Sequence, residues 1–174
     1  MSHPTHPATV HFPITTTLLT GALDAGYWLA TSAPTRPAIA SAIHTLGIAI
    51  PPTDFPVLSY YTTLLTLLFA LPAIATGAYE LYPVIRRDGL ASPKARTGVA
   101  HALLNDLTTA AAAYNWWSRR NVPGFVPSGG NVFLSAVAAL PVTLWSAYLG
   151  GSLVYVYGMG FRGGQARGKA KKAQ

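Results

Sequence analysis

Two long stretches of this chain contain no Asp, Glu, Lys or Arg, and they constrain the fold more than any other feature. One covers residues 121–161 and the other covers residues 55–79. A helix needs roughly 20 mostly apolar residues to cross a hydrocarbon core of about 30 Å. Only 10% of all residues are charged, whereas soluble proteins carry about 25%. The sequence therefore predicts an integral membrane protein.

The net charge of +7 does not predict a nucleic acid as partner. The basic residues fall in the predicted loops and the C-terminal segment, where anionic lipid headgroups are the expected partners. The chain has no cysteine, which excludes disulfides and thiolate ligands for metals or iron–sulfur clusters. The first 13 residues lack a basic n-region, so a cleaved signal peptide is not expected.

The apolar segments predict an all-α fold, a four-transmembrane-helix bundle, in a single domain over residues 1–160. The predicted spans are about residues 12–30, 58–82, 97–118 and 132–157. The first helix begins either near Pro13 or at Pro7 with a bend at Pro13, and Pro83 marks the predicted end of the second span. Residues 161–174 form a basic tail that we expect to be disordered.

The first loop, residues 32–56, is long for a helical bundle. Pro37 suits the start of a helix, and Ile39, Ile43 and Leu46 fall near one face at offsets of 4 and 7. We therefore predict a short interfacial helix in this loop, lying on the membrane surface or over the mouth of the bundle.

The distribution of Lys and Arg predicts the orientation of a multi-pass protein. Four spans place both termini and the second loop on one side. That side carries nine basic residues, Arg86, Arg87, Lys94, Arg96, Arg162, Arg167, Lys169, Lys171 and Lys172. The other side carries three, Arg36, Arg119 and Arg120. Because positive loops stay in the cytosol, both termini are predicted to face the cytosol or its equivalent compartment.

The third predicted span has a polar face. Its members follow offsets of 4, 7, 11, 14 and 18 from the first, and they are His101, Asn105, Thr108, Ala112, Asn115 and Arg119. These residues stay within about 40° of one line along a helix. Polar groups in a membrane helix cost free energy unless they face the interior of the bundle, so we expect this face to point inward. Interhelical hydrogen bonding by Asn105, Thr108 and Asn115 is the plain interpretation.

Three residues that could bind a cofactor converge at the positive mouth of the predicted bundle. His11 opens the first span, His101 lies early in the third, and Glu80 ends the second on the same side. Two imidazoles and a carboxylate suit a metal ion, and the histidine pair alone suits haem b with two axial ligands. Gly77 and Gly98, each one turn before a member of this set, would leave room for a flat ring. The alternative is a hydrogen-bonded structural cluster at the headgroup level.

Two aspartates lie inside the predicted spans. Asp24 is 13 residues beyond His11, or about 20 Å along a helix, so we expect it near the opposite interface in a helix contact. Asp106 is turned about 140° from His101 around the helix. An intramembrane carboxylate of this kind indicates proton or ion handling. Four spans without an inverted repeat are few for a transporter, and a homodimer would supply the missing half.

Four motifs taken together resemble a known family. They are HPATVHFPI at residues 6–14, ATG at residues 75–77 followed by Glu80, HALLN at residues 101–105 with a later Asn115 and Arg119, and GGSLVY at residues 150–155 followed by GMG. The chain resembles a domain-of-unknown-function family of small four-helix integral membrane proteins. The resemblance covers most of the chain outside the first loop and the basic tail. It implies the four-span fold and no particular activity.

The sequence supports three hypotheses about function. The first is a b-type haem or metal-binding electron-transfer module that uses His11 and His101, with Glu80 nearby. The second is a non-catalytic membrane subunit whose polar face only orders the helices. The third is a small dimeric transporter or proton-handling protein built around Asp106. No phosphate-binding glycine loop, nucleophile elbow or zincin spacing is present, so no catalytic residue is predicted.

Overall fold

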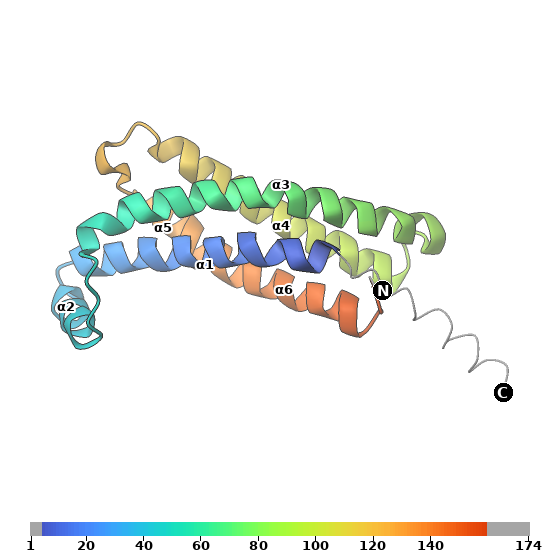
Figure 1. Cartoon of the computed structure of the whole chain (residues 1–174), viewed down its shortest axis with the longest axis horizontal. Helices are drawn as coiled ribbons and strands as arrows, with labels where there is room; N and C mark the ends of the chain where they lie inside the picture. The colour runs from blue at the N-terminus through green and yellow to red at the C-terminus, as the bar shows by residue number, and fades with distance from the viewer. Residues whose placement is uncertain (1–4, 160–174) are drawn as a thin grey trace.

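The computed structural model describes residues 5–159 and shows long helices that run side by side along one axis (Figure 1). Their bounds are α1 (Thr5–Thr31), α3 (Phe55–Asp88), α4 (Pro93–Arg119), and a continuous last helix made of α5 (Gly129–Val132), a π-helical segment η3 (Phe133–Ala139) and α6 (Leu140–Tyr155). Three short helices lie in the connections: α2 (Arg36–Thr45), η1 (Pro52–Asp54) and η2 (Pro123–Phe125). The all-α prediction is confirmed, because residues 5–159 contain no strand.

The long helices pack in a ring. α1 packs against α3, α3 against α4, and α4 against α6, while α1 closes the ring against η3. The start of α1, the α3–α4 connection and the end of α6 lie at one end of the bundle (Figure 1). We call this end the histidine end. The opposite end carries α2 and η2, and we call it the α2 end.

Several helix ends differ from the prediction. α1 begins at Thr5, with Pro13 inside it. The prediction that Pro83 ends the second long helix is wrong, because α3 continues to Asp88 through both Pro72 and Pro83. A proline removes one backbone hydrogen bond, and a long helix can lose that bond without ending. The short helix predicted in the first loop is confirmed as α2, in which no residue is buried.

A tight connection joins α3 to α4. Gly89 ends α3 with a φ of 75°, in the left-handed region that favours glycine. Three residues later the Ser92 side chain accepts a hydrogen bond from the backbone N–H of Ala95 at 3.2 Å and caps α4, and Pro93 occupies the first helical position. Stop and start signals therefore follow each other within four residues, and α3 and α4 form an antiparallel hairpin.

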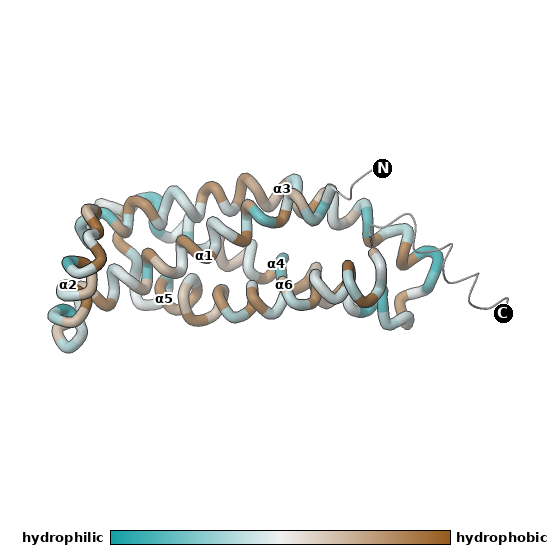
Figure 2. Tube along the Cα trace, turned by 60° about the horizontal axis from the view of Figure 1, so that its bottom comes forward, coloured by the Kyte–Doolittle hydropathy of each residue, from teal (hydrophilic) through white to brown (hydrophobic). Residues whose placement is uncertain are grey.

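The polarity of the molecule is inverted relative to a soluble protein. The buried apolar residues are mostly small, as Ala70, Ala73, Ala95 and Ala139 illustrate, and buried polar or charged residues outnumber them. Large apolar side chains on the long helices are exposed instead, among them Phe12, Leu19, Leu68, Leu71, Leu103, Leu107, Phe133, Val137, Leu144 and Trp145. Figure 2 shows hydrophobic positions recurring along the lengths of the helices. Water would disfavour this surface, whereas lipid would not.

Two helical segments are long and apolar enough to cross a membrane by length and composition. They cover Pro52–Asp88 and Gly129–Tyr155. Within the second, η3 ends two residues before Pro141, so the helix widens just before the proline that the sequence predicts as a kink. The basic tail predicted at residues 161–174 lies outside the described residues.

Candidate functional site

Two histidines face each other inside the histidine end of the bundle. His6 lies in the first turn of α1, and His101 lies in the third turn of α4. Their ring centroids are 6.2 Å apart, and the ring planes are nearly perpendicular, at 85°. Both side chains are half-buried. The chain therefore brings together two imidazoles that are 95 residues apart in sequence.

The His101 ring is held in one orientation by α6. Its Nδ1 lies 2.8 Å from the backbone carbonyl oxygen of Ser146. A carbonyl only accepts, so Nδ1 carries the hydrogen and Nε2 keeps a lone pair. The Asn105 amide nitrogen lies 3.3 Å from Nε2, but its shorter contacts are with the Ser146 hydroxyl and the His101 carbonyl, both at 2.8 Å. Those acceptors take both amide hydrogens and leave the Nε2 lone pair free.

The His6 ring is held in the same tautomer by α3. Its Nδ1 lies 3.2 Å from the Thr76 hydroxyl oxygen. That hydroxyl donates its own hydrogen to the Pro72 carbonyl at 2.8 Å, so it accepts from His6 Nδ1. His6 Nε2 therefore also keeps a lone pair. Glu80 Oε1 accepts the backbone N–H of His6 at 3.2 Å, which satisfies a free donor at the positive end of α1.

Glycines allow both rings to lie against neighbouring helices. A Cβ added at Gly77 would lie 2.9 Å from His6 Cε1, and one added at Gly150 would lie 3.0 Å from His101 Cε1. Either approach is tighter than a normal Cβ contact. The sequence singles out Gly77 and Gly98 as room for a flat ring. In the structure His6 lies over Gly77 and the Leu81 side chain fills the space at Gly98.

The two imidazoles line a cavity of about 200 Å³ between α1, α3, α4 and α6. Most of its wall is apolar and comes from residues such as Ile14, Ala70 and Leu153. Asn105 and Asp106 also line it. A largely apolar cavity with a few convergent polar groups is the usual form of a site for a small molecule or cofactor.

The other predicted site residues are placed differently from the sequence hypothesis. His11 is exposed and does not line the cavity. The hypothesis placed His11 beside His101, whereas the structure places His6 there. Asp106 lies at the cavity but is exposed rather than interior. Over residues 5–159 no three His, Asp or Glu side chains are grouped as a metal ion requires. Glu80 therefore caps α1 and does not complete a three-ligand set.

The α2 end contains a buried ion pair that sequence reasoning missed. Arg119 Nη1 lies 3.1 Å from Asp24 Oδ1, and the two side chains are 1% and 0% exposed. Ser59 and Ser135 each donate a hydroxyl hydrogen to the Asp24 carboxylate. The pair thus joins α1, α3, α4 and η3. The sequence predicts Asp24 as a helix contact near the opposite interface, and it places Arg119 on the inward polar face of the third span while counting it among the charges of that side. The structure buries both side chains and pairs them.

The remaining Arg119 donors bind the connection after α4 and the start of α3. Arg119 Nε donates to the Phe125 carbonyl at 2.8 Å, and Nη2 donates to the Pro56 carbonyl at 2.9 Å. Phe125 has a φ of 54°, which is unusual for a residue with a side chain. Its ring stacks on Tyr60 with the centroids 3.9 Å apart. The guanidinium and this stacking therefore hold a strained turn in place.

Between the two ends, hydroxyl groups of α1 and α3 contact each other. Thr66 donates to the Thr16 hydroxyl at 2.8 Å, and the Thr20 and Thr62 hydroxyls lie 2.9 Å apart. The signal was present in the sequence, since Thr and Ser recur at three- and four-residue spacing in both segments. Asn115 is buried beside this row, and Thr108 is half-buried. Polar side chains of α1, α3 and α4 therefore meet in the middle of the bundle.

The mouth at the histidine end is positively charged. Lys94 donates to the Tyr157 carbonyl at 3.1 Å and ties α4 to the residues after α6. Burial lowers the pKa of Lys94, and the positive charge of Arg87 lowers it further. A lowered pKa means that the protonated form costs free energy at this position, as expected where basic groups gather.

The inverted polarity, the helix lengths and the polar interior together define a helical membrane protein. The chain belongs to the family described as "Predicted membrane protein (DUF2231)", whose model matches residues 2–163. This assignment confirms the resemblance found in the sequence and the prediction of a membrane protein. Comparison with curated proteins and comparison with solved structures give no significant match.

Proposed function

We propose that all four long helices cross the membrane and that the histidine end faces the cytosol. α1 and α4 each have 27 residues, which corresponds to about 40 Å of helix and exceeds a hydrocarbon core of about 30 Å. Both helices carry exposed large apolar side chains, such as Phe12 and Leu19 on α1 and Leu103 and Leu107 on α4. The basic residues on either side of the α3–α4 connection, Arg86, Arg87, Lys94 and Arg96, favour the cytosolic side for this end.

We propose further that the protein is an electron-transfer module that binds a b-type haem through His6 and His101. The observation that carries this proposal is the 6.2 Å separation of the two ring centroids. Two imidazoles on opposite sides of one metal, with bonds of about 2.0 Å, have centroids roughly 6 Å apart. The bundle core between facing helices is also where such cofactors are held in other helical bundles.

The second support is the protonation state of the two rings. Each Nδ1 donates its hydrogen, His101 to the Ser146 carbonyl and His6 to the Thr76 hydroxyl. Metal-binding histidines typically donate one ring nitrogen in this way, which fixes the ring and raises the basicity of the other nitrogen. The apolar wall of the cavity would exclude water from the macrocycle. Haem held by two imidazoles supplies reversible one-electron chemistry.

The donor set favours haem over a bare metal ion. A non-haem ion needs three or more protein ligands, and within the described chain His6 and His101 have no third His, Asp or Glu grouped with them. Glu80 already accepts the His6 backbone N–H. A macrocycle brings four nitrogen ligands of its own, so two histidines complete its coordination.

The proposal is tested by titrating the purified apoprotein in detergent with haemin and recording its absorption spectrum. The expected result is a stoichiometric Soret band and, after reduction, the sharp visible bands of low-spin haem with two imidazole ligands. His6→Ala and His101→Ala should each abolish the low-spin spectrum. His11→Ala is the matched control and should leave it unchanged.

The same variants separate this proposal from its rivals. Loss of the spectrum in His11→Ala with retention in His6→Ala would restore the pair predicted from sequence. Absence of haem binding by the unaltered protein, together with no metal by elemental analysis, would overturn the cofactor proposal. A structural role for the histidines would then account for their hydrogen bonds.

A further inference from the structure

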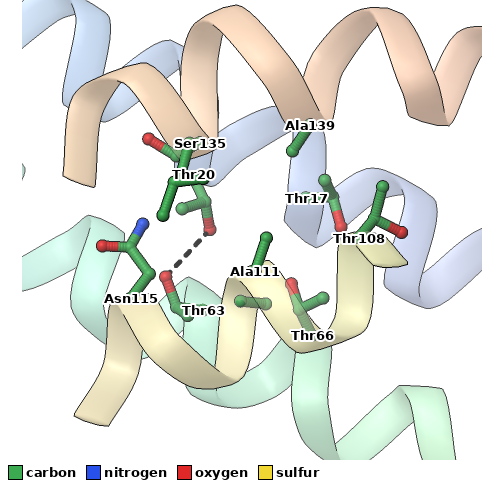
Figure 3. Close-up of a pocket in the computed structure, with 11 residues that line it drawn as sticks. Thr17, Thr20, Thr63, Thr66, Thr108, Ala111, Asn115, Ser135 and Ala139 are labelled. Carbon is green, nitrogen blue, oxygen red and sulfur yellow. Dashed lines mark hydrogen bonds between the residues drawn. The ribbon is translucent and has the colours of Figure 1, made fainter. Parts of the chain in front are cut away.

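We propose that the middle of the bundle is a binding site for one internal water molecule, held by Asn115. A second cavity, of about 20 Å³, lies there among hydroxyl and small side chains. A water molecule requires about 10–15 Å³ of such space and two or more polar partners. Figure 3 shows Thr20, Thr63 and Asn115 beside one another at this cavity, with Ala111 on the same wall.

The occupant of this cavity is inferred from a buried side-chain oxygen that has no hydrogen-bond partner. Asn115 is 2% exposed, and its Oδ1 accepts no hydrogen bond from the described residues. Asn115 Nδ2 faces the Asn131 carbonyl at 3.5 Å, and a turned amide would place two acceptors opposite each other there. A buried acceptor without a donor destabilises the fold, so this position calls for a donor.

The hydroxyls of three neighbours have already used their hydrogens. Thr63 donates to the Ser59 carbonyl at 2.7 Å, and Ser135 donates to Asp24 Oδ2 at 2.7 Å. Thr108 donates to the Asn105 carbonyl at 2.9 Å. Each of these oxygens still has a lone pair that can accept. Water brings two hydrogens, one for Asn115 Oδ1 and one for a hydroxyl oxygen such as that of Thr63.

The site lies beside the cavity of the histidine end. Thr17 and Thr66 line both this cavity and the cavity that holds His6 and His101. Ser135 lines the small cavity and contacts Asp24. The proposed water therefore lies between the histidine cavity and the buried ion pair. This inference is independent of whether haem binds.

The test is a nuclear magnetic resonance experiment on the full chain in detergent micelles, with only asparagine labelled. The chain has four asparagines, Asn105, Asn115, Asn121 and Asn131, and Asn115→Leu assigns the relevant side-chain amide. Cross-relaxation between water and each amide is measured. We expect a long-lived water contact at the Asn115 amide, whereas exposed Asn121 should show only rapid exchange.

A filled cavity provides the matched comparison. Ala111→Val adds two methyl groups at the cavity wall and should remove the water contact, while Ala110→Val, on the exposed face of the same helix, should leave it unchanged. If Ala111→Val fails to fold, Thr63→Val takes its place. It replaces a hydroxyl partner of the water by a methyl group of similar size, and it should shorten the lifetime of the water contact. Absence of the contact in the unaltered protein, or its full persistence in a folded Ala111→Val or Thr63→Val variant, would overturn the proposal.

Discussion

The two ends of this bundle use polar groups in opposite ways. At the α2 end, Asp24 and Arg119 are almost fully buried, and carboxylate and guanidinium both have several partners. At the histidine end, His6 and His101 are half-buried, and each presents a free lone pair beside a cavity of about 200 Å³. A satisfied network resists change, whereas incompletely used donors and acceptors indicate a binding site. In the proposed function, stability and ligand binding therefore depend on opposite ends of the molecule.

The largest effect is expected from breaking the ion pair. Arg119→Met should lower the free energy of unfolding by about 3–5 kcal/mol, because it leaves the Asp24 carboxylate buried without a counter-charge. Unfolding in detergent by heat or denaturant measures this loss. Arg120→Met, which alters an adjacent residue that is not buried, is the control. Equal small losses in both variants would show that the buried pair does not hold the α2 end together.

A smaller but distinct effect is expected at the close contact of α1 with η3. A Cβ added at Gly21 would lie 2.8 Å from the Ser135 backbone oxygen and 2.7 Å from Leu140 Cδ2. Backbone cannot move aside as a side chain can, so Gly21→Ala should cost about 1–3 kcal/mol of stability. Gly151→Ala, with no atom within 4 Å of the added carbon, should be nearly neutral. A tolerated Gly21→Ala would mean that the helices can separate there.

At the histidine end, a lost hydrogen bond should affect binding more than stability. Ser146→Ala removes the hydroxyl that accepts from the Asn105 amide at 2.8 Å but keeps the carbonyl that orients His101. We expect about 1 kcal/mol of destabilisation and an approximately tenfold weaker affinity for haemin, in line with losses of neighbouring hydrogen bonds at metal sites. Melting temperature and the haemin titration measure the two effects. Loss of stability with unchanged affinity would assign Ser146 to the fold alone.

The smallest effect concerns pH. Burial lowers the pKa of Lys94 from its usual 10.5, so the unfolded chain binds its proton more tightly than the folded chain. Stability should therefore rise slightly as pH increases through the alkaline range just below 10.5. In Lys94→Gln this rise should be absent. An identical pH profile for both proteins would show that the charge at Lys94 is not disfavoured by folding.

Much of the architecture was predictable from the sequence because it depends on charge and hydropathy. The charge-free stretches gave the apolar segments, and Pro37 with its periodic neighbours gave α2. Helix ends were harder. Pro83 was read as an end, but the cost of one missing hydrogen bond is small beside the packing of a long helix, and Gly89 ends α3 instead.

The predicted site residues and the cavity coincide only in part. His101 lies at the cavity, yet its partner is His6, because α1 begins seven residues before the predicted span starts at residue 12. Asp24 and Arg119 share one end in the predicted topology, so their pairing could have been inferred. Arg119 belongs to the polar face that the sequence predicts to point inward, but its pairing with Asp24 does not follow from that periodicity alone. Contacts across helices depend on rotation, which hydropathy alone does not give.

The four-residue connection between α3 and α4 has a consequence for biogenesis. In the proposed topology α4 carries Asp106 and Arg119 across the bilayer, and helix α3 is apolar enough to partition on its own while α4 does not meet the same criterion within the described chain. Gly89 ends α3 and Ser92 caps α4. The connection between them is too short for α4 to remain in water while α3 is in the bilayer. In this topology the hydrophobic helix inserts together with its more polar neighbour as one hairpin, and Asp24, which precedes both helices in the chain, can then neutralise the arginine.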